Sequence, residues 1–119
     1  MMKTNEAVMA FSQSEKIKAG LIWISQILEL LQGLPDEQRK GGEGTARMLL
    51  GMVAQEMALA RVLTGIEHWQ DAESHLEKAV VMVESGVAEE ALLHLSRALS
   101  KVTNIAQESM SLLKESGLL

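Results

Sequence analysis

A fourteen-residue pattern occurs twice in the second half of the chain. Residues 70–83 read QDAESHLEKAVVMV, and residues 89–102, nineteen positions later, read EEALLHLSRALSKV. The matched pairs are Ala72 and Ala91, His75 and His94, Leu76 and Leu95, Lys78 and Arg97, Ala79 and Ala98, Val80 and Leu99, and Val83 and Val102. The shared apolar positions recur every three or four residues, which is the period of one helical face. The pattern therefore predicts two helices of similar face and length, joined as a tight antiparallel hairpin.

The same period extends through the rest of the chain and predicts four helices, at roughly 13–32, 45–64, 69–84 and 88–115. The core stripe of the last helix is Ala88, Leu92, Leu95, Leu99, Val102, Ala106 and Leu113. Its heptad-like spacing favours the shallow helix crossing of bundles. The joints between the second, third and fourth helices are short, and short joints make neighbouring helices antiparallel. We therefore expect an all-α fold, an up-and-down antiparallel four-helix bundle.

Residues 1–119 are expected to form a single domain, because a chain of this length can bury one modest core. Ser12 and Glu15 have the spacing of a capping box, which predicts a helix start near residue 13. Residues 1–11 would then be disordered or form a short extra helix.

The segment 35–44, PDEQRKGGEG, is polar and rich in glycine, and it is predicted to be a flexible loop. Gly51 lies inside the second predicted helix, where glycine costs about 1 kcal/mol of helix propensity relative to alanine. A close crossing of two backbones at Gly51 would explain that cost. The second helix is apolar on almost every side, which predicts a place inside a bundle or at a subunit interface.

Composition excludes several classes of function. Eleven basic and sixteen acidic residues give a net charge of −5, and an acidic chain is a poor candidate for binding nucleic acid. The chain has no cysteine, no recognisable signal peptide and no apolar run suited to a membrane, so we expect a cytoplasmic protein. We find no catalytic, metal-binding or cofactor-binding motif, and the chain is predicted to be non-enzymatic, with no metal and no cofactor.

The duplicated pattern carries one family resemblance. Residues 69–82, WQDAESHLEKAVVM, resemble the second helix of a tetratricopeptide repeat, and residues 87–102 resemble a second copy. That repeat recurs every ~34 residues, whereas the copies here lie nineteen residues apart with no helix between them. Ala and Leu at these spacings are also what any close-packed helical hairpin requires, and this second interpretation is the one we favour.

The two matched histidines carry another resemblance. His75 and His94 resemble the phosphorylatable histidine of histidine-phosphotransfer domains, which are four-helix bundles with a basic residue three positions after the histidine. Lys78 and Arg97 occupy that basic position here. The resemblance implies a phosphorelay protein in which His75 or His94 accepts the phosphoryl group and Lys78 or Arg97 neutralises its charge.

Two observations favour a structural role for these histidines instead. The family has glycine four positions after the histidine, where this chain has Ala79 and Ala98. Each histidine also follows an acid by four residues, Asp71 or Glu90, a spacing at which helix pairs contribute about 0.2–0.5 kcal/mol. Phosphotransfer is therefore the alternative hypothesis.

The leading hypothesis rests on an excess of apolar surface. A second apolar stripe on the first helix, formed by Trp23, Ile27, Leu30 and Leu34, exceeds what a small bundle needs for its core. Eight methionines add adaptable contact surface. A homodimer would cover this stripe, unless residues 7–11 fold back over it. We therefore expect a non-enzymatic helical protein–protein interaction or adaptor module that is a homodimer, with this stripe as its interface.

Overall fold

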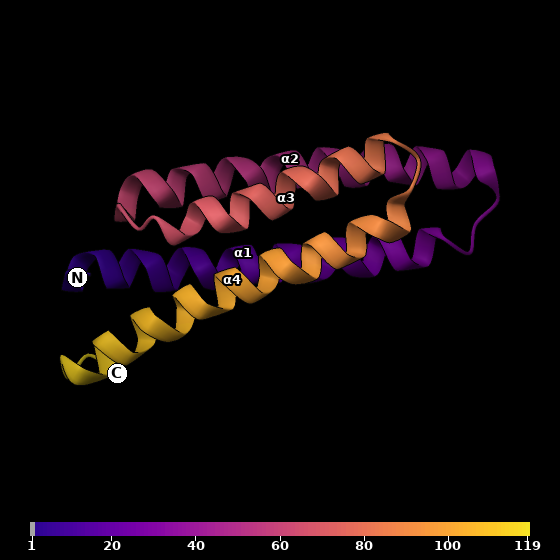
Figure 1. Cartoon of the computed structure of the whole chain (residues 1–119). Coiled ribbons are helices and arrows are strands. Elements are labelled where there is room, and N and C mark those ends of the chain that lie inside the picture. The colour runs from indigo at the N-terminus through magenta and orange to yellow at the C-terminus, as the bar shows by residue number, and fades with distance from the viewer. Residues whose placement is uncertain (1) are drawn as a thin grey trace.

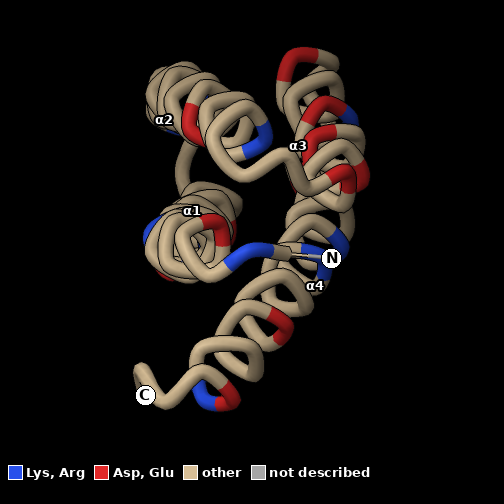
Figure 2. The backbone as a smooth tube through the Cα atoms, turned by 90° about the vertical axis from the view of Figure 1, so that its left-hand side faces the viewer, with Lys and Arg blue, Asp and Glu red and all other residues tan. Residues whose placement is uncertain are grey.

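The computed structural model describes residues 2–119, which contain four helices and no strand. The helices are α1 (Thr4–Leu31), α2 (Asp36–Thr64), α3 (His68–Glu84) and α4 (Ala88–Glu115). Consecutive helices run antiparallel, and α4 packs against both α3 and α1, so that the four helices form a ring (Figure 1, Figure 2). The result is a rod of 52 × 22 × 18 Å. The predicted all-α, up-and-down antiparallel four-helix bundle is confirmed.

The first helix begins at Thr4, so the predicted start near residue 13 is wrong. The backbone N–H of Lys3 donates a hydrogen bond of 2.8 Å to the carboxylate of Glu6, which satisfies one donor at the true helix start. The capping-box spacing at Ser12 and Glu15 therefore lies inside α1, where helical backbone bonds already satisfy the local N–H groups.

Residues 4–11 form the first turns of α1, which corrects the prediction for residues 1–11 of disorder or a separate short helix. Ala7 and Ala10 are fully buried and continue the core face of the helix, so packing extends it toward the N-terminus. The same continuity removes the alternative in which residues 7–11 fold back over the outer stripe of α1. Residue 1, which the prediction included, lies outside the described residues.

The predicted loop at 35–44 is also wrong, because α2 begins at Asp36. Pro35 stands just before the helix, where its fixed φ and missing N–H are tolerated. Asp36 and Glu37 place negative charge at the positive end of the helix dipole. The guanidinium of Arg39 also lies 3.0 Å from the carboxylate of Asp36. These N-terminal signals outweigh the low helix propensity of the glycines that follow.

Glycine lets α1 and α2 approach closely at two places. A Cβ at Gly42 would overlap the side chain of Leu31, and one at Gly20 would lie 3.2 Å from Cγ2 of Val53. Gly51 does not mark such a crossing, which corrects the prediction for that residue. It is exposed, and no atom in the described part of the chain comes within 4 Å of a Cβ placed there, apart from neighbouring backbone.

The duplicated pattern forms the predicted antiparallel hairpin of α3 and α4. Gly86 takes a left-handed conformation with φ of 80°, and the N–H of Val87 donates over 3.0 Å to the carbonyl of Met82, which closes the end of α3. Leu76 and Leu95, which match in the two copies, are both buried. The shared apolar positions therefore serve the core.

The core is a single apolar layer between the four helices. Trp69, at the start of α3, is the largest of its fully buried side chains. Aliphatic residues from all four helices surround it, including Leu21, Leu28, Leu50, Met57, Leu76, Leu95 and Val102. In the described range, residues 2–119, we find no helix with the length and apolar character that a membrane crossing requires.

Candidate functional site

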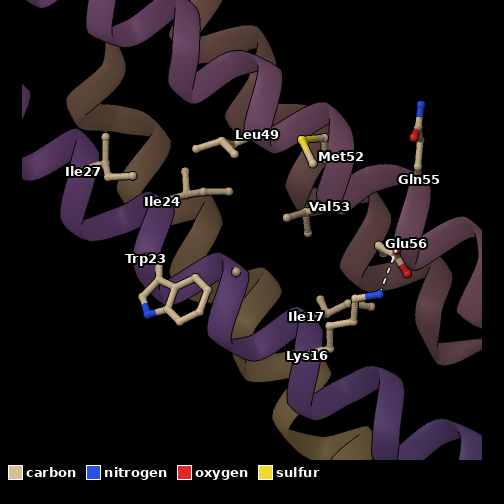
Figure 3. Close-up of a pocket in the computed structure, with 11 residues that line it drawn as sticks. Lys16, Ile17, Trp23, Ile24, Ile27, Leu49, Met52, Val53, Gln55 and Glu56 are labelled. Carbon is tan, nitrogen blue, oxygen red and sulfur yellow. Dashed lines mark ion pairs between the residues drawn. The ribbon is translucent and has the colours of Figure 1, made fainter.

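An apolar groove lies between α1 and α2 on the outside of the bundle (Figure 3). Its volume is about 410 Å³. The apolar side chains that line it are Ile17, Trp23, Ile24 and Ile27 from α1, and Leu49, Met52 and Val53 from α2. The close approach of Gly20 to Val53 brings the two helices together at this level. The groove therefore offers apolar surface from two helices to a single ligand or partner.

The structure brings two of the four predicted interface residues to this groove. Trp23 and Ile27 line it, whereas Leu30 and Leu34 are exposed beyond its lining. Trp23 is 65% exposed and Leu30 is 75% exposed, so the bundle does not cover this stripe. That the stripe binds a partner stays a prediction.

The α2 wall of the groove is absent from the predicted interface. Met52 is 61% exposed, and Met48, Leu59 and Val62 are also exposed on α2. In chain order, the intervals between successive members of this stripe are four, three, four and three residues, the members being Met48, Met52, Gln55, Leu59 and Val62. This is a second heptad stripe, separate from the buried stripe of α2, and the spacing could have revealed it in the sequence.

Polar side chains close one end of the groove. The ammonium of Lys16 lies 3.2 Å from Oε1 of Glu56, and the amide of Gln13 donates over 3.2 Å to Oε2 of the same carboxylate. The hydrogen bond from Gln13, followed by the bond and the charge of Lys16, lowers the pKa of Glu56 below its ordinary value of 4.5. The charges of Lys16 and Glu56 compensate each other, so the groove carries no net charge.

His75 and His94 lie on α3 and α4, away from this groove. Each is half-buried, and in each the Nδ1 atom is buried without a hydrogen-bond partner. Burial lowers the pKa of His75 below its ordinary value of 6.5, and the positive charges of Lys78 and Arg97 lower it further. Lys101 and His94 act in the same direction.

The acid partners predicted for the two histidines do not bind them. In the part of the chain that the structure describes, neither Asp71 nor Glu90 forms an ion pair or hydrogen bond with the histidine four residues later. Lys78 lies one helical turn after His75 on α3, and the charge of Arg97 on α4 also acts on His75; both were assigned to phosphotransfer. Phosphotransfer through His75 or His94 stays a prediction.

Two further findings concern ligands and relatives. Among residues 2–119, no group of three or more His, Asp or Glu side chains is placed to hold a metal ion. Comparison of the chain with protein-family models, with curated proteins and with solved structures finds no match.

Proposed function

We propose that this protein acts by binding protein through its α1–α2 face, as a non-enzymatic helical interaction or adaptor module, and that it binds a second copy of itself. The α1–α2 face is the groove lining together with the exposed Leu30, Met48, Leu59 and Leu63 around it. The observation that carries the proposal is the exposure of Trp23 and Met52 on the two walls of the groove.

Burial of this face would be strongly favourable. Of the fourteen large apolar side chains that are exposed within residues 2–119, six belong to this face, namely Trp23, Leu30, Met48, Met52, Leu59 and Leu63. Each Å² of apolar surface removed from water contributes about 25 cal/mol, and soluble monomers rarely expose a large contiguous apolar patch. Trp and Met are also residue types enriched at protein interfaces.

A second copy of the chain fits this face better than a charged partner does. The face combines a hollow with protruding side chains such as Trp23 and Leu30, so a two-fold axis can place the protrusions of one copy against the hollow of the other. Lys16 and Glu56 neutralise each other there, which spares two chains of net charge −5 from repulsion at the contact. The heptad spacing of the outer α2 stripe also suits helix-on-helix packing.

Sedimentation equilibrium of the purified protein tests the proposal. We expect a dimer at micromolar concentration, and we expect Met52→Glu to shift the equilibrium to monomer because it places a charge in the interface. The matched control is Leu93→Glu on the outer side of α4, where Leu93 is 55% exposed and Met52 is 61% exposed. This control should remain dimeric.

Both substitutions change exposed side chains, so each variant should keep the helical circular dichroism of the parent protein. A wild-type protein that remains monomeric throughout the micromolar range would contradict the proposal. Equal weakening of the dimer by Met52→Glu and Leu93→Glu would also contradict it, because the contact would then not be specific to the α1–α2 face.

A further inference from the structure

Basic side chains gather along the outer side of the contact between α3 and α4. Lys78 follows His75 by one helical turn on α3, and Arg97 and Lys101 follow His94 by three and seven residues on α4. These spacings place each set on one face of its helix. Figure 2 shows Lys and Arg on α3 and α4 on the side of the bundle away from α1 and α2.

The face of α3 that carries His75 and Lys78 lies toward the face of α4 that carries His94, Arg97 and Lys101. On the opposite flank of α3, Glu73 forms a 2.7 Å ion pair with Arg61 of α2, so the flank that carries His75 faces α4. Beyond the effect of burial, the charges that lower the pKa of His75 include those of Arg97 and Lys101 on α4. The five basic groups therefore form one cluster across the two helices.

No acidic side chain forms an ion pair with this cluster among residues 2–119. Lys78, Arg97 and Lys101 take part in none of the ion pairs among residues 2–119. No Asp or Glu stands three or four residues from any of the three, although the chain has sixteen acidic residues. The positive charge at this place is therefore available to a ligand.

We propose that this cluster, formed by His75, Lys78, His94, Arg97 and Lys101, binds a phosphate group without covalent chemistry. A guanidinium can donate two parallel hydrogen bonds to phosphate oxygens, and an ammonium adds a compact positive charge. The buried Nδ1 atoms leave Nε2 as the nitrogen that each imidazole can offer to the ligand. The site lies across the ring from the α1–α2 face and does not depend on the proposed dimer.

The three histidines of the chain allow a direct test, because His68 is exposed at the start of α3 and lies outside the cluster. The ring resonances of all three can be followed by NMR with and without inorganic phosphate, with sodium chloride keeping the ionic strength constant. A phosphate bound in the cluster should shift the resonances of His75 and His94 and leave those of His68 unchanged.

Variants of the basic residues test whether the cluster holds the phosphate, and a second probe tests which kind of molecule carries it. Arg97→Gln and Lys101→Gln should each weaken phosphate binding roughly tenfold, whereas Lys114→Gln, near the end of α4, should not. A phosphoserine peptide provides the second probe. Tighter binding of this peptide than of inorganic phosphate would identify a phosphorylated protein as the source, and the reverse would identify free phosphate.

Two results would overturn the proposal. In the first, phosphate shifts all three histidines equally or shifts none of them. In the second, the shifts at His75 and His94 persist unchanged in both Arg97→Gln and Lys101→Gln, which would show that the cluster does not hold the anion.

Discussion

Lys16 of α1 and Glu56 of α2 form an ion pair, with 3.2 Å between Nζ and Oε1, at the polar end of the groove. The amide of Gln13 donates to the other carboxylate oxygen, so this end of the groove is held by three side chains from two helices. The pair links the two walls of the α1–α2 face, whose remaining side chains are apolar apart from Gln55.

We predict that Glu56 contributes to the loss of stability in acid. Its pKa is lower in the folded protein than the ordinary 4.5, so its contribution is present above that value and is lost as the pH falls through the folded pKa. The thermal midpoint of Glu56→Gln should therefore fall less than that of the wild type below about pH 4.5. Glu77→Gln, at an exposed site, is the control and should follow the wild type. Parallel curves for wild type and Glu56→Gln would refute this assignment.

A second pH dependence is predicted at His75. Its pKa is lowered in the folded protein, so the unfolded chain binds more protons between the folded pKa and 6.5, and stability falls as the pH drops through that window. The midpoint of urea unfolding should rise as the pH is raised through this window in the wild type, and it should rise less in His75→Gln. His68→Gln should keep the wild-type slope. An unchanged slope in His75→Gln would show that other groups cause the dependence.

Two glycines of α2 should respond in opposite ways to alanine. Gly51→Ala adds a methyl group in open space, and the gain in helix propensity should stabilise the protein by about 0.5–1 kcal/mol. Gly42→Ala forces Leu31 to move, and overpacking should outweigh that gain, for a net loss of roughly 1 kcal/mol. Urea unfolding of both variants measures the difference. Similar stabilisation by both substitutions would mean that α1 and α2 are not in close contact at Gly42.

The two tryptophans should have separate roles. Trp69 is fully buried, so Trp69→Ala should lower the free energy of unfolding by about 3–5 kcal/mol. Trp23 is 65% exposed, so Trp23→Ala should leave the stability of the monomer almost unchanged. If the wild-type protein is a dimer, its thermal midpoint should rise with protein concentration, and Trp23→Ala should abolish that rise. A large loss of stability in dilute Trp23→Ala would place Trp23 in the fold rather than at an interface.

The helical class and the α3–α4 hairpin were predictable because their signals are periodic. Leu76 and Leu95 belong to apolar patterns that recur every three or four residues, and both residues are buried. Such a pattern can be recognised in the sequence because it follows from which face of the helix is buried. Helix starts were less predictable, because polar and glycine-rich stretches suggest loops. Asp36 begins a helix because its charge suits the helix dipole. The glycine at position 42 fits within that helix because it lets α2 pack against Leu31 of α1.

The candidate site was only half predictable for a related reason. Trp23 and Ile27 stand out as a surplus stripe on α1, but their pairing with Met52 and Val53 depends on which face α2 turns to α1. The spacing of apolar residues along α2 does not determine how α2 is rotated about its own axis relative to α1. The basic cluster has a related origin: the sequence places Lys78 and Arg97 at matched positions, but only the packing of α3 against α4 lets the charge of Arg97 act on His75.

If two copies meet through the α1–α2 face, labels beside that face will lie closer together in the dimer than labels on α4. Because the chain has no cysteine, a single spin label can be attached at Gln26→Cys, beside this face, or at Ser100→Cys, on the exposed side of α4. Pulsed electron paramagnetic resonance then measures the separation of the two labels in a dimer. We predict a clearly shorter distance for the label at position 26 than for the label at position 100. The reverse order, or no dipolar coupling at either position, would show that two copies do not meet through the α1–α2 face.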